Sequence, residues 1–172
     1  MPKFGYKGKW IIKCFRPDGS LKWAEFINNL ITLEGRIHAQ DVIFKGGTAY
    51  STHYILLFNS DSTPVSTWEY SEIGTDFDEW VDYDETVRQT WTCGAIDSGD
   101  ASLTNDASPA SFTASTGVDD TLYGAAMVNV NTKGDAVSGV GIEWCATRFS
   151  TSRPIVAAEV IKIIYTLNAV DV

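Results

Sequence analysis

The sequence has few of the residues on which active sites and metal sites are usually built. Its two histidines, His38 and His53, have no Glu or His partner at the spacing of a metal site, and no Gly-x-Ser-x-Gly motif is present. The three cysteines, Cys14, Cys93 and Cys145, form no Cys-x-x-Cys pair, which argues against a zinc knuckle or a disulfide framework. The sequence therefore predicts no enzyme, no cofactor and no metal, and we interpret the cysteines as small buried apolar residues.

Long apolar runs are also missing. No stretch approaches the roughly 18 apolar residues of a membrane helix, and the first residues, "MPKFGYKGKW", lack the continuous apolar segment of a signal peptide. We therefore expect no membrane association, and a chain that stays where it is made or leaves as part of an assembly. With 172 residues, 44% hydrophobic and 20% charged, the composition is that of one globular domain with a sizeable core.

The whole chain has a net charge of −9, and positive charge is scarce outside its first quarter. Residues 1–45 carry eight Lys and Arg against four Asp and Glu, a balance of +4, whereas residues 46–172 carry five against eighteen, a balance of −13. An acidic body repels nucleic-acid phosphates, so we expect no nucleic-acid partner. A basic, aromatic-rich arm suits an acidic partner surface, or its cations are simply the solvated faces of a hairpin. The candidate contact residues are Lys7, Lys9, Trp10, Arg16, Lys22 and Trp23.

The N-terminal part predicts a β-hairpin followed by a helix. The β-prone segments "KWIIKCF" (9–15) and "LKWAEF" (21–26) flank "RPDGS", in which Asp-Gly supplies a tight turn. From residue 27 apolar residues recur every three or four positions, which predicts one amphipathic helix over about residues 27–40, capped by Asn28 or Asn29. Gly46-Gly47 then lets the backbone reverse into the first core strand.

The rest of the chain has the pattern of strands separated by Gly, Asp and Ser turns. The predicted strands span residues 49–59, 88–96, 110–115, 122–130, 140–149 and 159–169, with a short one around Leu103. We predict a mainly β fold, an antiparallel β-sandwich or jelly-roll-like domain, with the N-terminal β-hairpin and one short α-helix. Residues 1–45 are predicted to form an attachment arm, and residues 46–172 the β-sandwich body.

In the segment "SEIGTDFDEWVDYDET" (71–86), six carboxylates within residues 76–85 are interleaved with three aromatic residues. This segment is open to three interpretations: a calcium loop, a glycosidase-like carboxylate pair beside sugar-stacking aromatics, or a solvated loop anchored by its aromatic side chains. The spacing does not match an EF-hand, and the third interpretation is the simplest. Arg88, just beyond, is the predicted internal partner of one of these acids.

Several segments, in order, resemble a family of small virion structural proteins of tailed bacteriophages. They are "LKWAEFINNLITLEGRIHAQDVIFKGGTAYSTHYILLF", "EWVDYDETVRQTWT", "NDASPASFT", "LYGAAMVNVNTKGD" and "EVIKIIYTLNA". The resemblance runs from about Lys22 to the C-terminus, and the first twenty residues are less typical of the family. No single motif carries it; the ordered set does.

The resemblance implies a non-enzymatic component of the particle, made in the host bacterial cytoplasm and located in the virion. The expected role is a capsid decoration (cement) protein, a homo-oligomer that binds the major capsid protein or other virion proteins. A tail or head–tail accessory protein is the first alternative. From another class, a glycan-binding host-adsorption module would use exposed aromatic residues and acids of residues 68–91. The family has no catalytic residues to carry over.

Overall fold

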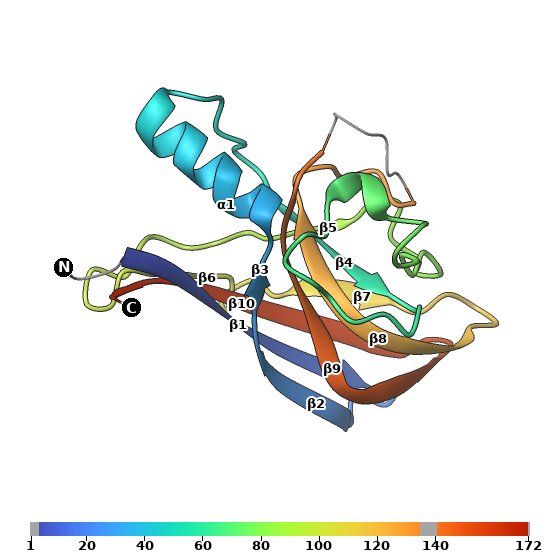
Figure 1. Cartoon of the computed structure of the whole chain (residues 1–172). Coiled ribbons are helices and arrows are strands. Elements are labelled where there is room, and N and C mark those ends of the chain that lie inside the picture. Colours follow the sequence, from blue (N-terminus) through green and yellow to red (C-terminus); the bar gives the residue numbers. More distant parts are fainter. Residues whose placement is uncertain (1–3, 135–140, 172) are drawn as a thin grey trace.

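The chain folds into two antiparallel sheets and a projecting helical segment, as seen in a computed structural model that describes residues 4–134 and 141–171 (Figure 1). Sheet A has the strand order β2-β1-β10-β6, with β7 also paired to β10, and sheet B has the order β3-β9-β8-β4-β5. The predicted mainly β sandwich with an N-terminal hairpin and one short helix is confirmed. The elements are β1 (Phe4–Phe15), β2 (Leu21–Asn28), β3 (Leu30–Ile31), α1 (Leu33–Gln40), the π-helix η1 (Asp41–Lys45), β4 (Tyr54–Phe58), the 3-10 helix η2 (Tyr70–Glu72), β5 (Gln89–Thr90), β6 (Ser102–Thr104), β7 (Ala110–Thr113), β8 (Asp119–Val128), β9 (Glu143–Val156) and β10 (Val160–Asp171).

The N-terminal hairpin is part of the sandwich and not a separate arm. Strand β1 pairs along its whole length with β10, from Phe4 opposite Asp171 to Phe15 opposite Val160. Strand β2 pairs with the other edge of β1 after a turn in which Gly19 has φ +82°. The predicted boundary after residue 45 therefore separates strands that belong to one sheet. None of the helices in the described part of the chain is both long and apolar enough to cross a bilayer.

The predicted helix begins later than expected. Ile27 lies in β2 and Leu30 in β3, because the chain crosses from sheet A to sheet B around Asn29, whose N–H donates to the Gly8 carbonyl oxygen at 2.9 Å. Their apparent helical spacing is produced by this crossing between two strands. Thr32, and not Asn28 or Asn29, caps α1, since its Oγ1 accepts the Gly35 N–H at 3.0 Å.

The base of α1 is fixed to the sandwich by glycine packing. A Cβ on Gly35 would collide with the backbone of Trp144 in β9, so glycine is required where helix and strand touch. The helical segment ends at Gly46, whose φ is +72°, and a Cβ on Gly47 would collide with the Asp41 carboxylate. The Gly-Gly pair therefore ends the helix, and the chain returns beside it (Figure 1), with the rings of His38 and Tyr50 stacked 4.8 Å apart. As a result the strand predicted over residues 49–59 begins only at Tyr54.

Both faces of sheet B are buried. Ile55 and Leu57 of β4 pack into the core between the sheets, whereas Leu56 and Phe58 pack outward against residues 68–77, where Trp68 and Phe77 stack with ring centroids 4.4 Å apart. This double burial explains the unbroken apolar run Tyr-Ile-Leu-Leu-Phe. The strand predicted over residues 88–96 is reduced to β5 because most of that segment is exposed loop.

Candidate partner-binding surface

Sheet A has one buried face and one bare face. Along β1, Trp10, Ile12 and Cys14 are fully buried and face sheet B, so the alternate residues point away from the core. Ile11 of β1 points outward, and its partner on β2 is Phe26, which is 72% exposed. No outward residue of β1 or β10 belongs to the described core clusters. The outer face of sheet A is therefore a surface that the described part of the chain leaves uncovered.

This bare face is positively charged on an acidic protein. Its cations are Lys7, Lys9 and Lys13 of β1 and Lys162 of β10, and its apolar side chains include Ile11, Phe26 and Ile164; we call this set the lysine face. Within the described side chains of β1, β2 and β10, no Asp or Glu lies on it. Lysines around exposed apolar residues form a surface that suits an acidic protein partner.

Lys13 and Lys162 stand directly opposite each other in the β1–β10 ladder. Like charges in opposed cross-strand positions destabilise a sheet. Among the described side chains of β1, β2 and β10, no carboxylate lies between these two lysines on this face. The pair is therefore a place where an approaching anionic group lowers the electrostatic free energy.

The six predicted contact residues divide between surface and core. Lys7 and Lys9 are exposed on the lysine face, and Arg16 is exposed at the hairpin turn. Trp10 is fully buried, so its selection as a contact residue is wrong: alternation along β1 turns it into the core.

The last two candidates, Lys22 and Trp23, are held by other parts of the chain. Lys22 makes an ion pair with Glu159 at 2.8 Å, where its side chain is 20% exposed. Trp23 packs against the core with its ring under the Arg153 guanidinium. Sequence reasoning missed Lys13, Phe26 and Lys162, and the odd-numbered lysines of β1 were a signal for Lys13 alone.

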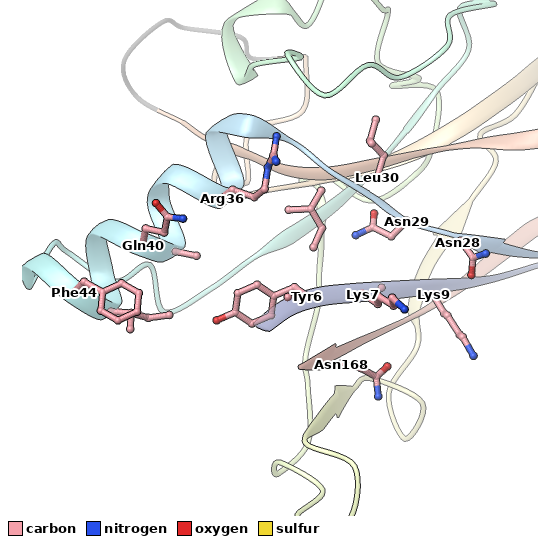
Figure 2. A pocket seen from close by; sticks show the side chains of 15 residues that line it. Tyr6, Lys7, Lys9, Asn28, Asn29, Leu30, Arg36, Gln40, Phe44 and Asn168 are labelled. Atoms are coloured by element: carbon pink, nitrogen blue, oxygen red, sulfur yellow. The ribbon is translucent and has the colours of Figure 1, made fainter. Parts of the chain in front are cut away.

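A groove adjoins one end of the lysine face. It has a volume of about 760 Å³ and lies between the start of β1, the β2–β3 crossing and the helical segment (Figure 2). The segment projects from the sandwich (Figure 1), and only Gly35 and Ala39 of α1 are buried. Phe44 of η1 is 80% exposed and lines the groove. We call this site the helix groove.

The acidic segment is a well-anchored loop. Phe77, Trp80 and Tyr83 are all buried, and Arg88 binds Glu79 through two hydrogen bonds of 2.9 and 2.6 Å, as predicted. In the described ranges, no group of three or more His, Cys, Asp or Glu residues is arranged to hold a metal ion. The geometry thus favours the anchored-loop interpretation over the calcium loop.

The tryptophans do not form an exposed row. All six lie within the described residues: Trp10, Trp68, Trp80 and Trp91 are buried, and Trp23 and Trp144 are partly buried against the core. A glycan-binding module would stack sugars on exposed aromatic rings. This arrangement weakens the glycan-binding alternative, since that hypothesis depended on exposed tryptophans.

The cysteines differ in accessibility. Cys14 and Cys145 are buried as predicted, but Cys93 is exposed in the loop after β5, so its interpretation as a buried residue is wrong. Burial, and next the nearby Glu159 carboxylate, raises the pKa of the Cys14 thiol to about 12. Burial likewise raises the pKa of the Cys145 thiol.

We expect one thiol of the native protein to react quickly with Ellman's reagent at pH 8 and all three to react in denaturant, because the thiolate is the nucleophile. A Cys93→Ser variant should show no fast-reacting thiol. A second fast thiol in the native protein would contradict the burial of Cys14 and Cys145.

No protein-family model, curated protein or solved structure matches the chain. The function must therefore be inferred from the chemistry of its own surface.

Proposed function

We propose that the chain is a non-enzymatic structural protein of a tailed bacteriophage particle, a capsid decoration protein that binds the major capsid protein lattice. The observation that carries the proposal is the lysine face: an uncovered sheet surface whose described charged side chains on β1, β2 and β10 are all cationic, on a chain of net charge −9. The resemblance of the sequence segments to virion proteins supports the choice of the major capsid protein as the partner. Lysines at the contact set register and association rate, and Phe26 and Ile164 would supply affinity when the partner covers them.

Repeated binding on a lattice requires one attractive face on each copy. The lysine face supplies that attraction toward an acidic lattice, although the chain as a whole has a net charge of −9. Many modest contacts then add through multivalency when oligomers bridge neighbouring capsid subunits.

The first test is the copy number of the chain in purified particles, by quantitative mass spectrometry against the major capsid protein. We expect one copy per capsid subunit or a simple fraction of it. A handful of copies per particle would support a tail or head–tail accessory role instead. Absence from the particle would refute both virion roles.

The lysine face itself is tested by reversing the opposed pair. We expect Lys13→Glu/Lys162→Glu to lower affinity for particles lacking the chain by at least about tenfold, measured by co-sedimentation, because attraction becomes repulsion. The variant keeps a like-charged cross-strand pair, so its folding stability should change little. Lys45→Glu, compared with Lys162→Glu alone, is the matched control, since it reverses one charge at an exposed position away from this face. Equal binding by both variants would remove the lysine face from the proposal.

A further inference from the structure

The helix groove has a composition unlike the rest of the molecule. Of the described residues that line it, none is acidic, although the chain holds 22 Asp and Glu. The lining includes Lys7, Lys9 and Arg36 and four residues with side-chain amides, Asn28, Asn29, Gln40 and Asn168. Of these, Arg36 and Gln40 lie on the helical segment, whereas the Lys9 and Asn168 side chains point away from it, toward the lysine face (Figure 2). An anionic occupant is therefore favoured in this groove, in contrast to most of the surface of the chain.

The groove also has an apolar side. Figure 2 shows Arg36, Gln40 and Phe44 along the helical segment, and Tyr6 reaching from β1 toward the end that carries Phe44. Ile43, 54% exposed, and Phe44 line this side. Large apolar side chains left in water beside cations and amides are typical of protein-recognition sites. The amides supply both donors and acceptors for a peptide backbone.

The position of the groove makes it continuous with the lysine face. Lys7 and Lys9 belong to both, and Asn168 of β10, directly opposite Lys7, also lines the groove. The floor is rigid: the Asn29 side chain accepts from Trp10 Nε1 at 3.2 Å and donates to the Tyr165 hydroxyl at 2.9 Å. A partner bound to the face therefore reaches a preformed groove at its edge, which reduces the entropy lost on binding.

We propose that the helix groove binds an extended, acidic segment of the partner protein. Its apolar side chain packs against Phe44, one carboxylate faces Arg36, and further carboxylates reach the lysine face along the edge where Lys7 and Lys9 adjoin the groove. This inference rests on the proposed function for the presence of an acidic protein partner. The volume of about 760 Å³ lies in the range of sites that enclose drug-sized ligands, roughly 300–1,000 Å³. Charge complementarity and the apolar wall favour a peptide over a nucleic acid, which would bring phosphates to a chain of net charge −9.

The test uses a short fluorescein-labelled peptide of Asp and Gly residues around a central Leu-Phe pair, titrated with the full chain and followed by fluorescence anisotropy. We expect saturable binding of this peptide and none of the peptide with Lys in place of Asp. Phe44→Ser/Arg36→Glu should weaken binding at least about tenfold, since it removes the apolar anchor and reverses a cation. Ile96→Ser/Arg16→Glu is the matched control, because both residues are exposed and outside the groove; it should bind as the unmodified chain does.

Three results would overturn the inference: no binding of the acidic peptide, equal binding by the groove variant and its control, or tighter binding of an oligothymidylate than of the peptide. Self-association that light scattering detects in the unmodified chain and not in Phe44→Ser/Arg36→Glu would assign the groove to a second copy instead. Failure here is distinguishable from failure of the proposed function. Lys13 and Lys162 do not line the groove. If Lys13→Glu/Lys162→Glu lost particle binding while Phe44→Ser/Arg36→Glu kept it, the proposed function would be supported and the groove would have no part in particle binding.

Discussion

Replacing Arg88 with Met is expected to destabilise the fold by about 3–5 kcal/mol, the usual effect of removing one partner of a buried ion pair. Arg88 and Glu79 side chains are 0% and 1% exposed. Arg88 Nη1 also donates to the Tyr70 hydroxyl at 3.1 Å and to the Val130 carbonyl oxygen at 3.0 Å. Loss of the guanidinium leaves the Glu79 carboxylate buried without its cation. For a chain of this length the melting temperature should fall by roughly 6–20 °C, measured by circular dichroism.

Two variants control this experiment. Glu79→Leu/Arg88→Met removes both charges and should recover part of the loss, because no unpaired ion remains. Lys45→Met breaks an exposed ion pair with Asp41, whose atoms are 3.7 Å apart, and should change stability by less than about 1 kcal/mol. If Arg88→Met melted within a degree or two of the unmodified chain, the buried pair would not hold this loop in place.

Replacing Glu143 with Gln is expected to stabilise the protein at pH 8 and not at pH 4. The Glu143 side chain is fully buried at the start of β9, and neither carboxyl oxygen has a hydrogen-bond partner within residues 4–134 and 141–171. Burial, and next the charges of Glu34 and Glu72, raises the pKa of this carboxyl well above its usual range. An unpartnered buried polar group is destabilising by about 1–3 kcal/mol, and more when it is charged.

The direction follows from proton binding. Because the folded-state pKa of Glu143 is raised, the folded chain holds this proton more tightly than the unfolded chain. The stability from this group is therefore complete below the unfolded pKa of about 4.3 and is lost as the pH rises through the folded pKa. Glu143→Gln cannot ionise, so it should match the unmodified chain near pH 4 and exceed it by at least about 1 kcal/mol at pH 8.

The measurement is urea unfolding of both proteins between pH 4 and pH 8. Asp106→Asn is the control, because it removes a carboxylate that is exposed and should give no pH-dependent difference of this size. A constant difference between Glu143→Gln and the unmodified chain across this range would show that the carboxyl does not titrate as the structure implies.

Local patterns predicted the features that depend on neighbouring residues. The Asp-Gly turn and alternation identified the hairpin, and the strong alternation of "EVIKIIYTLNA" identified β10. The charge and spacing of Arg88 were enough to predict an acidic partner in the loop before it. The β6 strand was also predicted from the short apolar segment around Leu103.

The missed features depend on contacts between distant parts of the chain. Ile27 and Leu30 showed a helical period because the chain crosses between sheets there, and that crossing is set by pairing with Gly8 and Ala146. Burial of Glu143 depends on residues far from it in sequence, including Glu34, which accepts its N–H at 2.6 Å. The lysine face likewise needs the register between Lys13 and Lys162, which no local pattern contains.

The pairing of the first strand with the last also governs when the binding surface comes into existence. Residues 4–15 find their partners at residues 160–171, so these contacts have the longest sequence separation in the described chain and form slowly. During synthesis, β1 leaves the ribosome long before β10 does, and Lys13 has no Lys162 opposite it until β10 has been made. A chain that stops before β10 therefore lacks Lys162 and Ile164, so that the proposed partner-binding face forms only after β10 has been synthesised.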